Sequence, residues 1–364
     1  MTFWRTHKKK HIWLLGNAAV LGAFFLLREN RAAAEWIASR LAAPYQHAAG
    51  RLCARTDASV MEVLVLLCLA AAAIWLVWSA VAVIRARGRR ASRAYGALLL
   101  AANVSLTLYA LFCLLWGVYY KVPSFSERAG VQTEPVSVED LTRTCAYFAR
   151  QLEKTARTVR RDDRGVFAED RSAILQNCEG VYREVEAEYP FLALEDSGAK
   201  AVRFSRVMSA LGFTGMYCPY TGESNVNVDC PACFLPSTVA HELAHQRGVA
   251  SEKECNFLAV LACTTSGKAE YVYSGWLLGY IHLGNALYAA DPEAYYAVLA
   301  LLPKTVIADL RNNNAYWQAF EDTTAERVSE KVYDGMLRAY GEEDGTRSYG
   351  MVVDLLVAYY KDAV

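Results

Sequence analysis

The sequence lacks any excess of charge. Its 38 lysine and arginine residues are balanced by 38 aspartate and glutamate residues. A protein that attracts nucleic acid through its overall charge would carry a basic excess, so we expect no nucleic-acid partner. What charge there is lies very unevenly along the chain, and its distribution is the more informative feature.

Charge is missing from three runs in the first third of the chain, residues 12–27, 63–84 and 94–120. The second and third exceed the roughly 20 apolar residues that a helix needs to cross a bilayer. The first is shorter and follows three lysines, as a signal peptide would, but Arg28 and Glu29 stand where a small-residue cleavage site belongs. We therefore predict three transmembrane helices in an uncleaved anchor, residues 1–120. The runs carry no charged pairs, which argues against a transporter or channel.

The placement of lysine and arginine predicts the orientation of these spans. Basic residues crowd the chain before the first run and the loop between the second and third: Arg5, Lys8, Lys9, Lys10, Arg85, Arg87, Arg89, Arg90 and Arg93. Residues 28–60 hold five arginines, but acidic residues dilute them. Because basic loops stay inside, we expect a cytoplasmic N-terminus and an extracytoplasmic chain after Lys121. Seven of the ten cysteines fall in this outer part, where disulfides are permitted.

Residues 121–364 are predicted to form a mostly helical domain. Amphipathic patterns predict helices at 138–161, 171–189 and 199–211, and again from Ser237 almost to the C-terminus. Between them, residues 212–236 are rich in Gly, Pro, Asn and Cys and predict short strands and turns.

One later segment, residues 271–290, has no charge and could form a fourth span by length. It contains Gly275, Gly279 and His282, which suit a lipid-facing helix poorly, so we predict a buried core helix.

The strongest local signal is the run HELAH at residues 241–245. Residues four apart share one face of a helix, so His241 and His245 present neighbouring imidazoles to one Zn²⁺ ion. Glu242 lies one residue round the helix, where it can act as general base on a water molecule. Two of the three histidines that follow residue 120 form this pair. The helix has a start and an end in Pro236, Ser237 and Gly248.

A catalytic zinc needs a third protein ligand, and two glutamates follow the turn at Gly248. Ser251 and Glu254 have the spacing of a capping box, which would direct Glu254 back to the backbone. We therefore favour Glu252 as the third ligand and keep Glu254 as the alternative. Asn256 lies four residues after Glu252, on the same face, and can hydrogen-bond the second nitrogen of a ligand histidine.

Cys230 and Cys233 form a Cys-x-x-Cys pattern before the metal helix. Outside the cytoplasm this pattern favours a disulfide, and redox activity is a further option. The pair could also join His241 and His245 in a closed Cys₂His₂ zinc site. The seven-residue gap is shorter than the spacing of about twelve in zinc fingers, and such a site gives the two glutamates no role.

Some polar residues are candidates for substrate contacts. Residues 222–227 can form an edge strand that pairs with a substrate backbone, with Asn225 and Asn227 on one face, or a polar turn. Candidates to stabilise a transition-state oxyanion are Tyr271, Tyr273, Tyr349 and His282. A core histidine bonded to backbone is the favoured interpretation of His282.

Several segments resemble an uncharacterised family of bacterial membrane proteins, domain of unknown function 3810. They are TGESN at 221–225, HELAHQRG at 241–248, EKECNF at 252–257, WGVYY at 116–120 and SYG at 348–350. Cys255 stands where the family has alanine, and the Cys230–Cys233 pair is outside its pattern. The resemblance implies a zincin-like metallopeptidase in the bacterial cell membrane. More distant zincins place a ligand glutamate four residues before Asp or Asn, which also favours Glu252.

These patterns predict a mainly α-helical protein with a membrane anchor, residues 1–120, and a zincin-like extracytoplasmic domain, residues 121–364. We expect a zinc-dependent hydrolase that cleaves a peptide or protein substrate. The alternative is a non-catalytic, zinc-stabilised domain that binds a partner in the cell envelope.

Overall fold

The computed structural model describes residues 2–131, 135–340 and 350–364, and it is mainly helical, as predicted. The chain divides into two compact units. The first comprises Met1–Ala49, Val60–Val122 and Pro219–Thr221, and the second comprises Gly50–Ser59, Pro123–Cys218 and Gly222–Val364.

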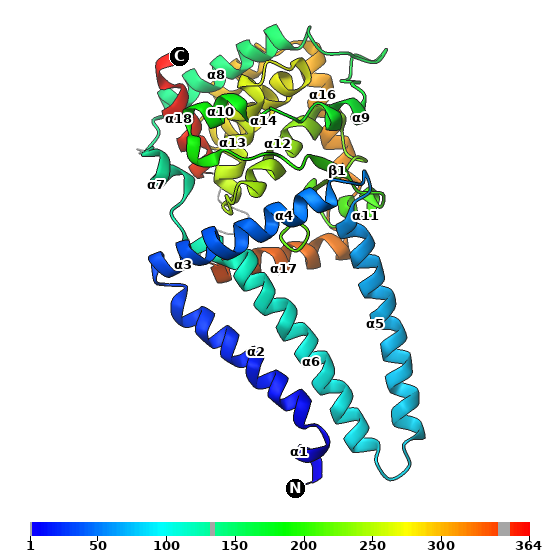
Figure 1. Ribbon diagram of the computed structural model, residues 1–364. Coiled ribbons are helices and arrows are strands. Elements are labelled where there is room, and N and C mark those ends of the chain that lie inside the picture. Colours follow the sequence, from blue (N-terminus) through cyan, green and yellow to red (C-terminus); the bar gives the residue numbers. More distant parts are fainter. Residues whose placement is uncertain (1, 132–134, 341–349) are drawn as a thin grey trace. The chain divides into compact units, whose positions relative to one another are not determined.

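The elements up to residue 121 are helical throughout (Figure 1). They are α1 (Thr2–Thr6), α2 (Lys8–Leu27), α3 (Arg31–Ile37), the π-helix η1 (Ala38–Ala42), α4 (Ala43–Cys53), α5 (Val60–Arg85), α6 (Arg90–Leu115) and the 3₁₀ helix η2 (Gly117–Lys121).

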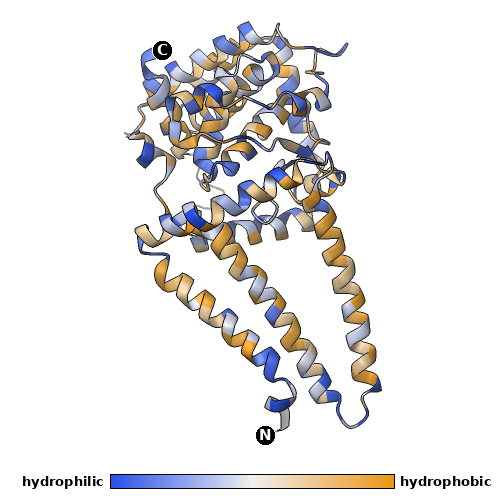
Figure 2. Cartoon of the chain, viewed as in Figure 1, coloured by the Kyte–Doolittle hydropathy of each residue, from blue (hydrophilic) through white to orange (hydrophobic). Residues whose placement is uncertain are grey.

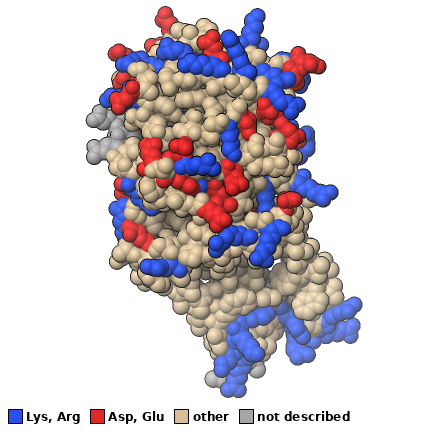
Figure 3. All heavy atoms as spheres, turned by 45° about the horizontal axis from the view of Figure 1, so that its top comes forward, with Lys and Arg blue, Asp and Glu red and all other residues tan. Residues whose placement is uncertain are grey.

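Three of these helices, α2, α5 and α6, are long and apolar enough to cross a membrane. Figure 2 shows hydrophobic residues along all three. The predicted third span is too long at its C-terminal end, because Trp116 leaves the helical conformation (φ −130°) and a 3₁₀ turn follows. The arginines between α5 and α6 are exposed. Over much of the surface visible in Figure 3, basic and acidic side chains are interspersed.

Polar side chains join α2 to α6 within these apolar helices. Asn17 donates to the backbone carbonyl of Asn103 (3.1 Å), and Thr107 donates to Asn17 Oδ1 (3.0 Å). Trp13 in turn donates to Thr107 Oγ1 (3.0 Å). Asn17 and Asn103 are buried. Such bonds between membrane helices each contribute about 0.6 kcal/mol on average and fix which helix faces pair.

The second unit contains the remaining elements. The helices are α7 (Phe125–Ala129), α8 (Val138–Thr155), α9 (Arg171–Gln176), α10 (Arg183–Glu188), α11 (Ser205–Ala210), α12 (Leu235–Gln246), α13 (Glu252–Thr265), α14 (Ala269–Ala290), α15 (Pro292–Leu299), α16 (Lys304–Gln318), α17 (Thr324–Tyr340) and α18 (Gly350–Tyr360). Short 3₁₀ turns are η3 (Pro190–Leu192), η4 (Ala232–Phe234) and η6 (Lys361–Ala363). The strands are β1 (Ala199–Ala201), β2 (Gly215–Cys218) and β3 (Glu223–Val226).

Two predicted helices differ from the helices in the structure. The predicted helix at 171–189 is two helices, α9 and α10, with Gly180 between them at φ 71°, a left-handed conformation that glycine adopts without strain. The predicted helix at 199–211 begins instead as strand β1, because residues 199–201 pair with β3, and becomes helical only at Ser205.

The core of this unit is built around α14, which packs against α8, α12 and α13. Tyr271, Tyr273 and Leu277 are completely buried there, so the prediction of a core helix is confirmed. Its glycines allow close helix approach: a Cβ on Gly275 would lie 2.5 Å from Cys263 Cβ, and one on Gly279 would lie 2.2 Å from Phe148.

The three strands form one sheet in the order β1–β3–β2. β1 runs parallel to β3, and β2 runs antiparallel to it. β3 is therefore the central strand, and the expectation that residues 222–227 form an edge strand is wrong. The edge strand beside the candidate site is β2, which precedes β3 in the chain.

The face of the sheet that carries Glu223 and Asn225 binds residues 50–59. Buried Lys200 donates to the carbonyls of Cys53 (2.6 Å) and Ala58 (3.1 Å) and to Glu223 Oε1 (2.9 Å). These three acceptors match the three donors of the ammonium group. Ser59 donates to Asn225 Oδ1 (2.6 Å). We call these contacts the Lys200 clamp.

Candidate metal centre

Helix α12 carries His241, Glu242 and His245. It begins at Leu235, two residues earlier than predicted, because the 3₁₀ turn η4 leads directly into it and Pro236 fits the first helical turn. It ends as predicted: Gly248 has φ 78°, and its amide donates to the carbonyl of His245 (3.0 Å). The sharp turn brings α13 back along α12, with which it packs closely.

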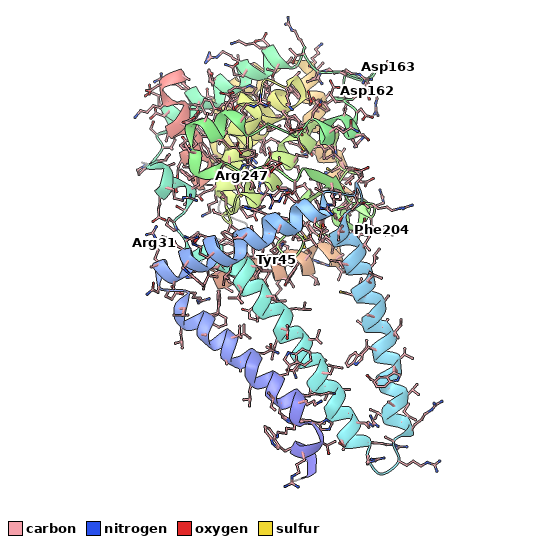
Figure 4. All side chains as sticks on the ribbon, in the orientation of Figure 1. Arg31, Tyr45, Asp162, Asp163, Phe204 and Arg247 are labelled. Carbon is pink, nitrogen blue, oxygen red and sulfur yellow. The ribbon has the colours of Figure 1, made fainter. Side chains whose placement is uncertain are left out.

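The C-terminal end of α12 is fixed by Arg247, which Figure 4 places among the helices of the second unit. Its guanidinium is buried and contacts Glu186 and Asp196, each at 2.6 Å. It also lies 3.9 Å from the centre of the Tyr182 ring. Two carboxylates and an aromatic face compensate for burying this cation, so the end of the helix is held rigidly.

The imidazole rings of His241 and His245 are oriented by bonds at Nδ1. His241 Nδ1 donates to Asn256 Oδ1 (3.0 Å), and His245 Nδ1 donates to the carbonyl of Val249 (2.8 Å). The Nε2 atom of each ring therefore points away from the oxygen that its Nδ1 binds. Both Nε2 atoms approach one carboxylate, that of Glu252, at 3.1 Å from His241 and 3.6 Å from His245.

The two glutamates at the start of α13 point in different directions. Glu254 accepts from the backbone amides of Phe125 and Ser126, both at 2.8 Å, and from the Ser126 hydroxyl at 2.8 Å. The predicted capping box is therefore wrong: Ser251 makes no side-chain cap bond, and Glu254 supports the start of α7 instead. The structure brings Glu252 to the histidines and holds Glu254 elsewhere.

Glu242 lies on the buried side of α12, against β2. The backbone amide of Tyr217 donates to its carboxylate, while its Oε2 has no hydrogen-bond partner among the described residues. Gly215 makes room for it, because a Cβ there would lie 2.3 Å from Glu242 Oε1. Burial raises the pKa of Glu242 to about 8, against the lowering effect of His241.

The charges of His241, His245 and Glu252 shift one another's pKa values. Burial lowers the pKa of His241, but the hydrogen bond and charge of Glu252 outweigh it and raise that pKa to about 9. Burial also raises the pKa of Glu252, and the two histidines outweigh it and lower it to about 2. Burial lowers the pKa of His245 to about 4. Without a metal, a proton on His241 therefore neutralises Glu252.

The ligand atoms of His241, His245 and Cys255 all lie within 4.8 Å of one another, so this group could hold a metal ion. The Cys255 thiol lies 3.3 Å from Nδ1 of His245 and 3.3 Å from the carbonyl of Val249. It therefore lies on the Nδ1 side of that ring, and Glu252 lies on the Nε2 side.

Other predicted site residues have structural contacts. Asn225 and Asn227 are completely buried, and Asn227 donates to Ser209 Oγ (2.9 Å) and to the carbonyl of Phe213 (3.0 Å). Bonds inside the protein occupy both side-chain amides, and a role for either in substrate binding remains a prediction. Cys230 and Cys233 are buried free thiols, and no disulfide joins them in the described chain.

The oxyanion candidates also lie in the core. The Tyr271 hydroxyl donates to the carbonyl of Ile174 (2.7 Å), and the Tyr273 hydroxyl bonds Asp309. Tyr349 lies outside the described residues. His282 is buried on α14, and burial, with a smaller effect of His241, lowers its pKa to about 4. A role for His282 in stabilising an oxyanion remains a prediction.

Sequence patterns missed one residue at the centre. Tyr333, on α17, donates from its hydroxyl to Glu252 Oε1 (2.5 Å). It is one of 22 tyrosines in the chain, and it lies about eighty positions from its partner in the sequence. No local spacing could have distinguished it.

A family model described as "Protein of unknown function (DUF3810)" matches residues 44–357. The chain belongs to this family. The match covers α5, α6 and every described residue around the histidine pair of this DUF3810 protein, and begins after α2. No curated protein and no solved structure matches the chain.

Because Glu252 raises the pKa of His241, removing the charge of Glu252 should lower that pKa in the metal-free protein. Glu252→Gln removes the negative charge and leaves the burial that disfavours an imidazolium. The pKa of His241 should fall from about 9 to below its usual 6.5. Histidine-selective NMR between pH 5 and 10, in the presence of a chelator, measures this. Glu254→Gln is the control and should leave His241 near 9, and an equal response to both variants would contradict the assignment.

Proposed function

We propose that this protein is a membrane-anchored zinc hydrolase that cleaves peptide bonds, with His241, His245 and Glu252 as zinc ligands. The observation that carries the proposal is the approach of two imidazole Nε2 atoms to one carboxylate. His241 Nε2 lies 3.1 Å from Oε2 of this carboxylate and His245 Nε2 lies 3.6 Å from its Oε1, and both distances are near the separation of about 3.3 Å between ligand atoms of a tetrahedral zinc with bonds near 2.0–2.1 Å. Two histidines and a glutamate are a ligand set of catalytic zinc sites, which keep the fourth position open.

Glu252 suits this role better than Cys255. Coordination through Cys255 would require His245 to use Nδ1, the nitrogen that donates to the carbonyl of Val249 (2.8 Å). Coordination through Glu252 uses Nε2 of both rings and keeps both Nδ1 bonds, and such bonds orient ligand histidines in zinc sites.

Zinc held by these residues supplies Lewis-acid chemistry, because it lowers the pKa of a water molecule toward neutrality and polarises a substrate carbonyl. Glu242 moves the proton: it accepts one from the attacking water and delivers it to the leaving amine. Burial raises its pKa to about 8 in the metal-free protein, and a Zn²⁺ ion beside the carboxylate would lower that pKa and favour the charged form that accepts a proton. Its Oε2 lacks a hydrogen-bond partner in the described chain and is available for this exchange.

The outer edge of β2, which pairs with no further strand among the described residues, provides a place for an extended peptide. The amide of Asn227 donates to the carbonyl of Thr214 (2.8 Å), which makes these residues a hydrogen-bonded pair of the β2–β3 ladder. Because such pairs alternate along an antiparallel ladder, the backbone groups of Gly215 and Tyr217 face away from β3. The bond from the Tyr217 amide to Glu242 agrees with this direction. A peptide paired with β2 would lie beside Glu242.

We place the N-terminus in the cytoplasm and the zinc site outside it, in the bacterial cell membrane, because the arginines between α5 and α6 mark the inner side. A reporter active only in the cytoplasm should therefore be silent when fused after Lys121 or at the C-terminus. Activity at either point would overturn this orientation.

The role of Glu242 predicts a separation of metal binding from hydrolysis. Glu242→Gln should keep about one zinc per chain while peptide cleavage falls by on the order of 100- to 10,000-fold. Cleavage of a peptide library followed by mass spectrometry, beside metal analysis of the same sample, measures both.

Gly215→Ala should give the same phenotype, because its Cβ would displace the Glu242 carboxylate. Gly22→Ala, where the added Cβ has no neighbour within 4 Å, is the matched control. Full activity of Glu242→Gln would refute the mechanism.

The ligand assignment predicts which variants lose zinc. Glu252→Ala should lose most of the metal, because one of three protein ligands is gone. Cys255→Ala and Cys230→Ser should both retain about one zinc per chain. Metal analysis of the purified variants decides the matter. If Cys255→Ala loses zinc and Glu252→Ala keeps it, the centre is a His₂Cys site, and the non-catalytic, zinc-stabilised domain becomes the better proposal.

A further inference from the structure

Each of the three proposed ligands has its own orienting partner. His241 is held by Asn256 and His245 by the carbonyl of Val249, both from α13 or the turn before it. Glu252 is held by the hydroxyl of Tyr333, at 2.5 Å from Oε1, which comes from α17. The orientation of two ligands is therefore built into the α12–α13 pair, whereas that of the third depends on a separate helix.

The side chain of Tyr333 makes contacts through both its hydroxyl and its ring. Its hydroxyl bonds Oε1 of Glu252, which leaves Oε2 of the same carboxylate 3.1 Å from His241 Nε2. Its ring meets Phe213 edge to face, with ring centres 5.5 Å apart. Phe213 lies two residues before β2. Tyr333 therefore joins α17 both to the proposed ligand and to the chain that leads into the edge strand.

Helix α17 buries few of its side chains among the described residues. Of its 17 residues, two are buried, Leu337 and Tyr340, and both lie near its C-terminal end. Val328 and Val332, which a core helix would bury, are 58% and 68% exposed. A helix with few buried apolar contacts opens at low free-energy cost, so the bond from Tyr333 to Glu252 links an easily opened helix to the proposed centre.

We propose that docking of α17 completes the zinc centre, with Tyr333 as the positioning residue for Glu252. This inference rests on the proposed zinc site and adds its regulation. When α17 is docked, the hydroxyl fixes the carboxylate with Oε2 toward His241. When α17 is released, Glu252 loses its orienting bond and zinc binding weakens. Because the coupling of two binding events is reciprocal, bound zinc must in turn hold α17 in place.

The test uses the full chain in detergent and zinc alone as the probe. Zinc affinity is measured by competition with a chelator, and hydrogen exchange of residues 324–340 is measured with and without zinc. Tyr333→Phe keeps the ring against Phe213 and removes the hydroxyl. It should weaken zinc binding by about 10- to 100-fold, as loss of an orienting partner does, and should abolish the slowing of exchange that zinc causes in α17.

Tyr316→Phe is the matched control, because the Tyr316 hydroxyl also donates to a carboxylate, Asp229 Oδ2 (2.7 Å), but outside the centre. It should leave zinc affinity and the zinc effect on α17 unchanged. If the wild-type chain binds zinc through Glu252 but exchange of α17 does not respond, the proposed coupling between α17 docking and zinc binding is overturned and the proposed function stands. If the chain binds no zinc, the proposed function falls and the inference falls with it.

Discussion

The two Nδ1 bonds of His241 and His245 are the constraint on which the candidate centre depends. An imidazole whose Nδ1 donates to a fixed oxygen has its ring plane set and its Nε2 aimed in one direction. Asn256 and the Val249 carbonyl are those oxygens, and both are in position because Gly248 reverses the chain between α12 and α13. The convergence on Glu252 follows from this turn.

The parts of the centre that lie close in sequence could be predicted from it. Helical periodicity places His241 beside His245, and a glycine turn followed by a new helix places Glu252 and Asn256 near them. The core position of α14 followed from Gly275, Gly279 and His282, which suit a lipid-facing helix poorly, and the structure places the two glycines against Cys263 and Phe148. These inferences needed only spacing and side-chain size.

What the sequence could not predict was decided by partners far along the chain. Glu254 has the spacing of a cap, but it binds amides of α7 about 130 positions earlier. Their sequence pattern predicts a helix for residues 199–201, but they form a strand because their backbone pairs with that of β3. Tyr333 reaches Glu252 from a distant helix. In each case a long-range contact outweighed or supplemented a local preference that was itself physically sound.

The central strand explains the TGESN segment, because neighbouring residues in a strand face opposite sides of the sheet. Ser224 donates to the carbonyl of Glu242 (2.9 Å) and so faces the metal helix. Glu223 and Asn225 face the other way and bind Lys200 and Ser59. One short strand thus positions the candidate base with one face and holds residues 50–59 with the other.

The Lys200 clamp means that the unit carrying the centre is not one continuous piece of chain. Residues 50–59 are made before α5 and α6, whereas their partners on β1 and β3 are made more than a hundred residues later. During synthesis, residues 50–59 can form their contacts with Lys200 and Asn225 only after β1 and β3 have been made. A truncated version starting at Pro123 would lack residues 50–59, which cover Lys200 and Glu223 on the sheet. The smallest fragment that keeps these contacts must therefore include residues 50–59.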